Sequence, residues 1–196
     1  MNKKWIIIIV IVIAVFAIYS FFTGKYNSMV TKEETVATEW SNVETQYQRR
    51  NDLIPNLVST VKGFAQQEQD VFIGVTEARA KASSINIDAN NLTAENMEQF
   101  QAAQGQLTSS LSRLLVTVEK YPELKSNQNF LELQAQLEGT ENRIAVARKR
   151  FNESAQDFNT FIRVFPNSVI AGWSGFERKA LFAADQGAEN APKVEF

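Results

Sequence analysis

Eighteen consecutive residues near the N-terminus, Trp5 to Phe22, contain no charged side chain, no proline and no glycine. A helix of this length spans about 27 Å, close to the hydrocarbon thickness of a bilayer. The run is rich in β-branched residues, but an isolated strand could not satisfy its backbone hydrogen-bonding groups in lipid, whereas a helix can. Aromatic side chains at both ends are typical of membrane–water interfaces. We therefore predict a membrane-spanning helix over residues 5–23, after a short flank of residues 1–4.

A cleaved signal peptide is the alternative interpretation of this stretch. Lys3 and Lys4 would supply its charged start, but the apolar run exceeds the usual core of about 7–15 residues and no small-residue cleavage pattern follows it. We therefore favour an uncleaved anchor. Lys3, Lys4 and the α-amino group precede the helix, and Lys25 and Lys32 follow it. The positive-inside rule then favours, by about one charge, an N-terminus inside and a soluble domain outside.

The composition excludes several classes of function. The chain contains no Cys, which rules out disulfides, thiolate nucleophiles and zinc fingers, and no His, which removes the commonest general base and imidazole metal ligand. Residues 23–196 hold 18 basic and 22 acidic side chains, interspersed without a basic run. This pattern provides no electrostatic footprint for nucleic acid, and an acidic domain is repelled by an anionic lipid surface.

Apolar residues recur with helical spacing through most of the remaining chain. The strictest stripe takes every seventh residue: Phe130, Leu137, Ile144, Phe151, Phe158 and Phe165. It predicts one long helix over residues 127–164, with Ser126 as the N-cap and an end before Pro166. A second stripe, from Met97 to Tyr121, predicts another helix with Thr93 as its N-cap.

Two further stripes run from Tyr26 to Arg50 and from Ile54 to Ala78, and their phase is continuous. Either the chain turns at Asn51–Asp52, with Pro55 in the first turn of a new helix, or one long helix bends at Pro55. We favour the turn, because proline is tolerated in a first turn and helices of similar length close a bundle. The expected fold is all-α: a single transmembrane helix followed, over residues 25–165, by an antiparallel four-helix bundle of long helices (bromodomain-like, up-and-down type).

Residues 166–196 form a separate C-terminal region that is rich in aromatic side chains, including Trp173, Phe176 and Phe182. We expect a short helix and a turn that fold back over one end of the bundle, followed by a tail. The alternative is that these aromatic residues form a patch that binds a partner.

Several charged residues fall on or beside the apolar stripes. We predict that they pair between helices as a structural polar network and determine which helix packs against which: Arg50, Glu68, Arg79, Glu141, Arg143 and Arg148. Glu33 is a further inward-facing candidate. The alternative is a carboxylate metal site, which without His would be restricted to oxygen ligands for Mg²⁺ or Ca²⁺. We assign no catalytic residue, no cofactor-binding residue and no metal ligand.

Three motifs stand in order along the chain: DLIPNLVSTVKGFAQQE (Asp52–Glu68) with VTEARAKA (Val75–Ala82), YPELKSNQNFLELQAQLEGTENRIAVARKRFN (Tyr121–Asn152) and FPNSVIAGWSGF (Phe165–Phe176). Together they resemble the LemA family, and the likeness extends from the anchor to near the C-terminus. The resemblance implies a bacterial single-pass membrane protein with an antiparallel four-helix bundle and no established enzymatic activity. The same family name has been used for a two-component sensor kinase, but a chain without His cannot autophosphorylate on one.

These observations predict a non-enzymatic protein: a membrane-anchored helical scaffold or adaptor of the bacterial cell envelope, located in the cytoplasmic (inner) membrane. Its expected partners are the lipid bilayer, through residues 5–23, and either envelope proteins or further copies of itself. We expect no nucleic acid, no cofactor and no small-molecule ligand. The alternative function is a ligand- or ion-sensing helical bundle that signals at the membrane.

Overall fold

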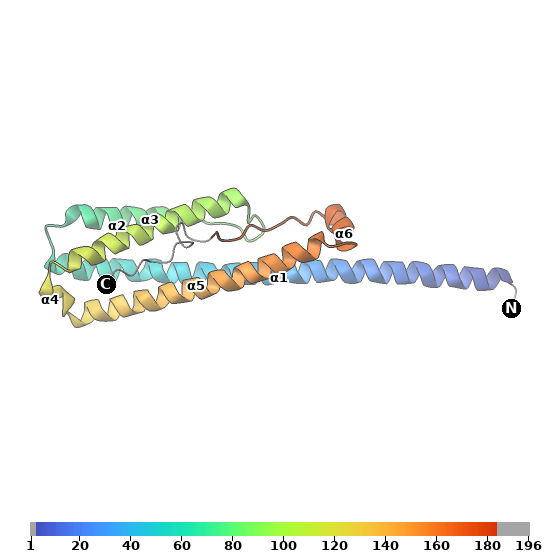
Figure 1. Ribbon diagram of the computed structural model, residues 1–196, viewed down its shortest axis with the longest axis horizontal. Coiled ribbons are helices and arrows are strands. Elements are labelled where there is room, and N and C mark those ends of the chain that lie inside the picture. The colour runs from blue at the N-terminus through green and yellow to red at the C-terminus, as the bar shows by residue number, and fades with distance from the viewer. Residues whose placement is uncertain (1–2, 184–196) are drawn as a thin grey trace, which may run out of the picture.

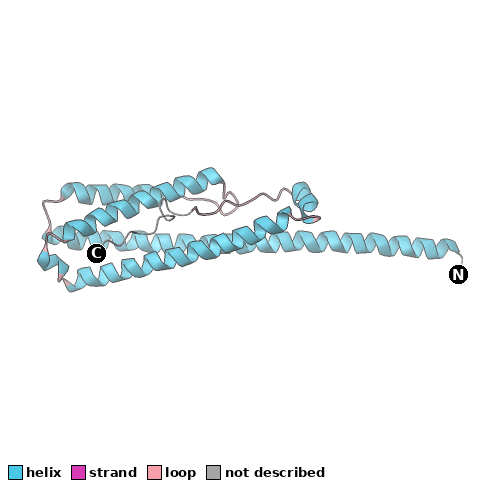
Figure 2. Cartoon of the chain, viewed as in Figure 1, coloured by secondary structure: helices cyan, strands magenta, loops and turns pink. Residues whose placement is uncertain are grey.

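The computed structural model describes residues 3–183, and within them the chain is helical, with no strand (Figure 2). The expected all-helical class is confirmed. The helices of this part of the chain are α1 Lys3–Phe64, α2 Gln69–Ser84, α3 Ala94–Val118, α4 Pro122–Lys125, α5 Gln128–Arg163 and α6 Asn167–Ser174. Most of the predicted C-terminal tail, residues 184–196, lies outside the described residues.

α1 has two parts: an exposed apolar part and a part that packs into the core of the domain. Its N-terminal third projects beyond the other helices (Figure 1), and the large apolar side chains from Trp5 to Phe22 are 39–69% exposed. The remainder of α1 turns one apolar stripe inward, including Met29, Val36 and Trp40. Within residues 3–183, α1 is the one helix that is long and apolar enough to cross a membrane.

The long helices pack side by side at the other end of α1. α5 runs back along α1, while α2 and α3 lie against each other as a second pair (Figure 1). The short helix α4 connects α3 to α5 at the end far from the N-terminus. This arrangement places the entire helical domain on one side of the exposed apolar segment.

Two apolar clusters fill the interior. The cluster nearer the exposed segment is strongly aromatic, and its Trp40 ring lies 5.4 Å from the rings of both Phe100 and Phe151. The farther cluster is mainly aliphatic and includes Ile54, Leu57, Val61, Leu107, Leu111, Leu114 and Leu124. Arg50 lies in α1 between the residues of the two clusters.

The predicted turn at Asn51–Asp52 is wrong. α1 continues through Pro55 to Phe64, so the alternative of one long helix is the observed one. The chain turns instead at residues 65–68, between α1 and α2. The physical reason is that the backbone carbonyl left without a donor by Pro55 finds one elsewhere in the protein, as described below.

The predicted continuous helix from Ile54 to Ala78 is therefore also wrong, because those residues are divided between α1 and α2. The Glu68 N–H donates to the Ala65 carbonyl over 3.1 Å to close the turn. No Pro or Gly marks this turn in the sequence, so tertiary packing must define it. Ala65 is 1% exposed and belongs to the same apolar cluster as Phe72 of α2.

The helix N-caps agree with the sequence in one case and differ in another. Thr93 caps α3 as predicted, with its side chain accepting from the Asn96 N–H over 3.2 Å. α5 is capped by Asn127, which accepts from the Phe130 N–H over 3.2 Å, so the predicted cap at Ser126 is wrong by one residue. The Ser126 hydroxyl instead donates to carbonyl groups of α4, whose last turn it completes.

The seven-residue stripe of α5 is buried as expected for its first five members, from Phe130 to Phe158. The sixth, Phe165, is 84% exposed because α5 has already ended at Arg163. After α6 the chain takes a left-handed conformation at Gly175 (φ 77°) and runs back across the helices. We call residues 177–183 the strap.

Candidate functional site: a buried arginine layer and a C-terminal strap

A layer of polar contacts separates the two apolar clusters. We call it the arginine layer; its members are Arg50, Gln104, Thr108 and Glu141. Its centre is Arg50 of α1, which is 1% exposed. The guanidinium donates to Gln104 Oε1 and, over 3.2 Å, to Thr108 Oγ1, both on α3, and over 3.1 Å to Glu141 Oε1 on α5. One side chain thus joins three helices. Glu141 supplies the opposite charge that a buried guanidinium requires.

Arg79 occupies a second position, immediately next to this layer. Pro55 has no N–H, so it cannot donate to the carbonyl four residues earlier, at Asn51. The Arg79 Nε donates to that carbonyl over 2.8 Å. The Asn51 side chain in turn donates to Ser83 Oγ over 3.2 Å. Two polar contacts from α2 therefore support α1 where proline interrupts its hydrogen bonding.

Two other predicted residues lie apart from Arg50. The Glu68 carboxylate is 3.7 Å from Lys120 Nζ and accepts from the Tyr121 hydroxyl over 3.4 Å, at the end of the domain near α4. Arg143 is exposed on α5 and lines a shallow pocket of about 430 Å³ beside Glu39. The six residues of the predicted network thus occupy separate positions, with Arg50 and Glu141 as the directly bonded pair.

The strap is held by two asparagines of α5 that bind its backbone. The Asn159 side chain donates to the Lys179 carbonyl and accepts from the Lys179 N–H, both over 2.8 Å. Asn152 makes the same pair of bonds to Phe182, over 3.1 and 2.9 Å. The Ala180 N–H donates to the backbone of the loop before α3 over 2.9 Å. These bonds hold the strap as an integral part of the domain.

Side chains at both ends of the strap reinforce this attachment. Lys179 is 7% exposed, and its ammonium lies 2.6 Å from the Glu33 carboxylate on α1. The Arg148 guanidinium donates to the Ala183 carbonyl over 3.1 Å and lies 4.8 Å from the centre of the Phe182 ring. Glu33 and Arg148, both singled out from the sequence, therefore contact the strap rather than the arginine layer.

Sequence reasoning misses the residues that hold the strap. Asn152 and Asn159 stand seven residues apart on α5, next to the apolar stripe, and that heptad spacing of two amides is a signal that could have found them. Lys179 carries no comparable signal, because its burial depends on Glu33, which lies far away in the sequence.

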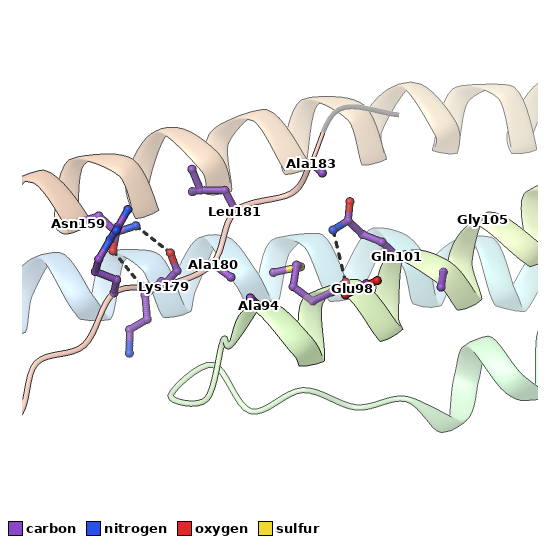
Figure 3. Close-up of a pocket in the computed structure, with 12 residues that line it drawn as sticks. Ala94, Glu98, Gln101, Gly105, Asn159, Lys179, Ala180, Leu181 and Ala183 are labelled. Atoms are coloured by element: carbon purple, nitrogen blue, oxygen red, sulfur yellow. Dashed lines mark hydrogen bonds between the residues drawn. The ribbon is translucent and has the colours of Figure 1, made fainter. Parts of the chain in front are cut away.

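An open groove of about 1040 Å³ lies between the strap and the first turns of α3 (Figure 3). Met97, Ala180 and Leu181 contribute apolar lining, while Glu98 and Arg178 contribute charge. In Figure 3 the strap crosses between α3 and α5, with the Asn159–Lys179 hydrogen bonds at one end of the groove. The groove is wide and open to solvent, and it has the size of a ligand site but few convergent polar groups.

Glu44 is a half-buried carboxyl of α1, one helical turn from Trp40, and its acidity is altered. Burial raises the pKa of Glu44 above its ordinary value, and a hydrogen bond from Trp40 opposes part of that rise. The Trp40 N–H donates to the Ile87 carbonyl over 3.1 Å. The ionised form of Glu44 is therefore less stable in the folded protein than in water.

The site as a whole is suited to joining helices. Arg50 and Glu141 neutralise each other, and the Lys179 ammonium is paired with Glu33. Within residues 3–183, no group of three or more acidic, His or Cys side chains is placed to hold a metal ion. The buried charges bind other elements of the same chain: Arg50 joins α1 to α3 and α5, and Lys179 joins the strap to α1.

A long exposed apolar helix that continues into a helical domain tied together by polar contacts defines a membrane-associated class of helical proteins. The chain belongs to the LemA family, whose family model matches residues 39–196. Arg50, Arg79 and Glu141 all lie within the matched region.

Relatives extend the comparison over nearly the whole chain. The magnetosome protein MamQ of Magnetospirillum gryphiswaldense is 28% identical over 196 residues, covering 89% of this chain and 71% of the relative. MamQ 1 of Paramagnetospirillum magneticum is 26% identical, with 90% and 71% covered. Protein LemA of Metamycoplasma hominis is 21% identical, with 94% and 80% covered. The names of these relatives describe no enzymatic reaction.

Proposed function

We propose that this chain is a single-pass protein of the bacterial cytoplasmic membrane whose helical domain is a non-enzymatic scaffold or adaptor of the cell envelope. The observation that carries the proposal is the continuity of α1, which runs without interruption over 62 residues from the exposed apolar segment into the core. A helix of this kind both anchors a domain and holds it at a defined position above the bilayer.

The anchoring half of the proposal rests on exposure. None of the window that qualifies α1 as a candidate membrane span is buried inside the protein. A continuous apolar surface of this extent is unfavourable in water and requires a lipid or protein environment. Its length of 18 residues, from Trp5 to Phe22, matches a lipid bilayer.

The uncleaved state is supported by the connection between the two parts of α1. Between Phe22 and Met29, the first buried core residue, the helix carries no proline and no break. Removal of residues 1–22 would leave the start of the core helix as a frayed end. An intact α1 instead gives the domain a stiff link to the membrane.

The scaffold half rests on what the charged side chains do. α1, α2, α3 and α5 fit an antiparallel four-helix bundle, and the buried Arg50 and Lys179 are used to hold its elements together. Apolar side chains such as Val116, Val146 and Leu131 are exposed singly over the domain, which is ordinary for a soluble surface. The outer face of the bundle is then available for envelope proteins or for a second copy.

A second candidate function is a ligand- or ion-sensing bundle. The groove beside the strap favours it, because a ligand that contacts both Arg178 and Glu98 would link the strap to α3. A thermal-shift screen of the full chain with divalent cations and small organic anions tests this function. An increase in melting temperature that disappears in a Glu98→Gln, Arg178→Gln variant would support it, and an unchanged melting temperature throughout would contradict it.

Two measurements test the proposal: the first tests the scaffold role, and the second tests which side of the membrane the helical domain faces. The tagged full-length protein, recovered from its native membrane in mild detergent, is expected to bring down the same envelope protein repeatedly, or a second copy of itself. Recovery as a bare monomer would contradict the proposal. Protease added to spheroplasts is expected to digest the helical domain, while inverted vesicles protect it; the opposite pattern would place the domain in the cytoplasm.

A further inference from the structure

Four large apolar side chains are exposed within residues 164–173, where α5 has ended and α6 follows. Phe165 is 84% exposed, Trp173 82%, Val164 48% and Val169 41%. We call these four residues the corner patch. Phe165 and Trp173 are the most exposed large apolar residues of the described chain, exceeding those of the apolar segment of α1. Clustered aromatic exposure of this degree marks a binding surface rather than an ordinary soluble one.

The corner patch lies at the level where α1 leaves the helical domain. In Figure 1, α6 is at the end of the domain from which the N-terminal third of α1 projects. The Phe176 ring, just after α6, lies 5.7 Å from the ring of Tyr26 on α1. Lys25 Nζ lies 5.8 Å from the centre of the Phe161 ring on α5. α5 and α6 are thereby placed within about one helical turn of Phe22.

This level corresponds to the interfacial region of a bilayer. Tyr26 is four residues beyond Phe22, which is about 6 Å along a helix axis. The headgroup region on each side of the hydrocarbon is about 5–8 Å thick. If residues 5–22 fill the hydrocarbon, the ring that packs on Phe176 lies among the lipid headgroups, and the corner patch stands at the same depth.

The chemistry of the corner also suits a lipid surface. Trp and Phe are the side chains that membrane interfaces favour, and interfacial elements bury their apolar face to about 5–10 Å. Residues 158–176 contain one charged side chain, Arg163, and no carboxylate, although the domain as a whole is acidic. On α1 the first charges after the apolar segment are Lys25 and Lys32. Asp157 and Glu177 flank this stretch, but Asp157 is paired with Lys32 and Glu177 is followed by Arg178. Lys25 and Arg163 therefore leave the corner with a net positive charge, which an anionic lipid surface does not repel.

We propose that the corner patch inserts into the headgroup region of the same bilayer that holds α1, and so forms a second membrane contact of the chain. The inference rests on the proposed anchoring through α1 and deepens it. With two contacts on one surface, α1 and α6 together fix the angle between the helical domain and the membrane, whereas with α1 alone the domain would tilt and rotate together with the membrane segment.

The absence of cysteine makes the depth of single positions measurable. Nitroxide labels are attached to four separate variants of the full chain, Ile13→Cys, Phe165→Cys, Trp173→Cys and Val116→Cys, each reconstituted into vesicles of phosphatidylethanolamine and phosphatidylglycerol. Ile13 is the reference in the hydrocarbon. Val116 is the matched control, an apolar side chain 68% exposed near the C-terminal end of α3, far from the anchor.

Collision rates with oxygen, which concentrates in lipid, and with a water-soluble nickel chelate report the depth. The ratio of oxygen to nickel collisions at positions 165 and 173 is expected to lie between the ratio at 13 and the lower ratio at 116. A ratio at 165 and 173 equal to that at 116, with 13 in lipid, would overturn the corner contact and leave the anchor standing. A water-like ratio at 13 as well would overturn the anchor itself.

Two further outcomes decide against the proposal. Labels at 165 and 173 that are shielded from both reagents would mean that protein covers the patch, from a second copy or another chain. If that shielding from both reagents persists in detergent micelles at protein concentrations too low for a second copy, the chain itself covers the patch. Circular dichroism of each variant, with an unchanged melting temperature, shows that the label has not disturbed the fold.

Discussion

Pro55 lies inside a long helix because another residue replaces the hydrogen bond that it cannot make. A proline in a helix interior costs about 3 kcal/mol or more, partly through the carbonyl that it leaves without a donor. Here that carbonyl, on Asn51, accepts from the Arg79 Nε over 2.8 Å. A side chain of α2 therefore stabilises α1 at a position where the local sequence favours a turn.

A double-mutant cycle tests this compensation. Arg79→Met removes the donor and is expected to lower the free energy of unfolding by about 1–3 kcal/mol, because a buried carbonyl is then unsatisfied. In a Pro55→Ala background the new N–H can reach the Asn51 carbonyl, so the same substitution is expected to cost at least about 1 kcal/mol less. Urea unfolding of the four proteins in mild detergent measures the difference. Equal costs in the two backgrounds would refute the compensation.

The ion pair of Arg50 and Glu141 provides the second prediction at this scale. Glu141→Gln keeps the shape but leaves the buried guanidinium without its countercharge, and a loss of about 1–3 kcal/mol in unfolding free energy is expected. The matched control is Glu153→Gln, also on α5, where the carboxylate is exposed and 3.8 Å from Lys149. That change is expected to stay within about 0.5 kcal/mol. Similar effects of the two substitutions would speak against a structural role for the layer.

The raised pKa of Glu44 makes a prediction about pH. Because the folded protein binds this proton more tightly than the unfolded chain, stability falls as pH rises from the unfolded value through the folded one, and the penalty then stays constant. Glu44→Gln removes the penalty and is expected to raise the melting temperature at neutral pH. The gain should shrink toward pH 4.5, the ordinary value, where both states are increasingly protonated. The exposed Glu34→Gln is the control, and a gain independent of pH would contradict the assignment.

At the scale of elements, the strap is a segment without regular structure that is nevertheless held firmly. Two amide side chains of α5 replace the neighbouring strand that an extended backbone would otherwise need, and Phe182 stacks with its ring centre 6.0 Å from that of Trp40. Buried backbone groups are satisfied in this way without a sheet. The strap thereby contributes to the aromatic cluster rather than lying over it.

Asn159→Ala is expected to loosen the strap. The substitution removes both bonds to Lys179, so hydrogen exchange at the amides of residues 179–182 should accelerate strongly, while exchange within α3 is unchanged. Asn142→Ala, an exposed position on the same helix, is the control and should leave the strap as it is. Hydrogen exchange followed by mass spectrometry measures both. Unaltered exchange in the Asn159 variant would show that apolar packing alone holds the segment.

The elements also show how far the sequence determines the fold. Helix identity follows from local periodicity, so both ends of α5 and the start of α3 are predictable to within a residue, whereas α3 ends at Val118, three residues before the end of its stripe at Tyr121. The turn is not predictable, because Asn51–Asp52 and Pro55 have the chemistry of a turn while residues 65–68 have none. Arg79, a donor from another helix, reverses this preference, and no local sequence pattern predicts its contact with Asn51.

Some contacts of the candidate site can likewise be predicted from the sequence, and others cannot. Arg50 and Glu141 can be singled out because they are charges on apolar stripes, and a buried charge needs an opposite charge nearby. That Glu33 pairs with Lys179, and that Arg148 reaches the strap, depends on where the chain returns after α6. That path is determined by tertiary packing and cannot be obtained from helical periodicity.

At the scale of the whole molecule, α1 is the element that combines a membrane segment with a structural core. Its exposed apolar third has no partner within the described protein, and its remaining length carries the contacts to α5 and to the arginine layer. Because one helix does both, the orientation of the domain is coupled to that of the membrane segment. Membership in the LemA family covers residues 39–196 and so includes most of the helical domain.

The most direct test of the account is the intact mass of the protein that remains in the membrane after alkaline carbonate extraction. An uncleaved α1 predicts that the chain stays in the pellet at its full mass of about 22.1 kDa. Ile9→Lys together with Ile13→Lys should release it, since each lysine at the centre of the bilayer costs about 3 kcal/mol, whereas Ile9→Leu with Ile13→Leu should not. Release of the unaltered chain, or a mature species that begins after Phe22, would contradict the account.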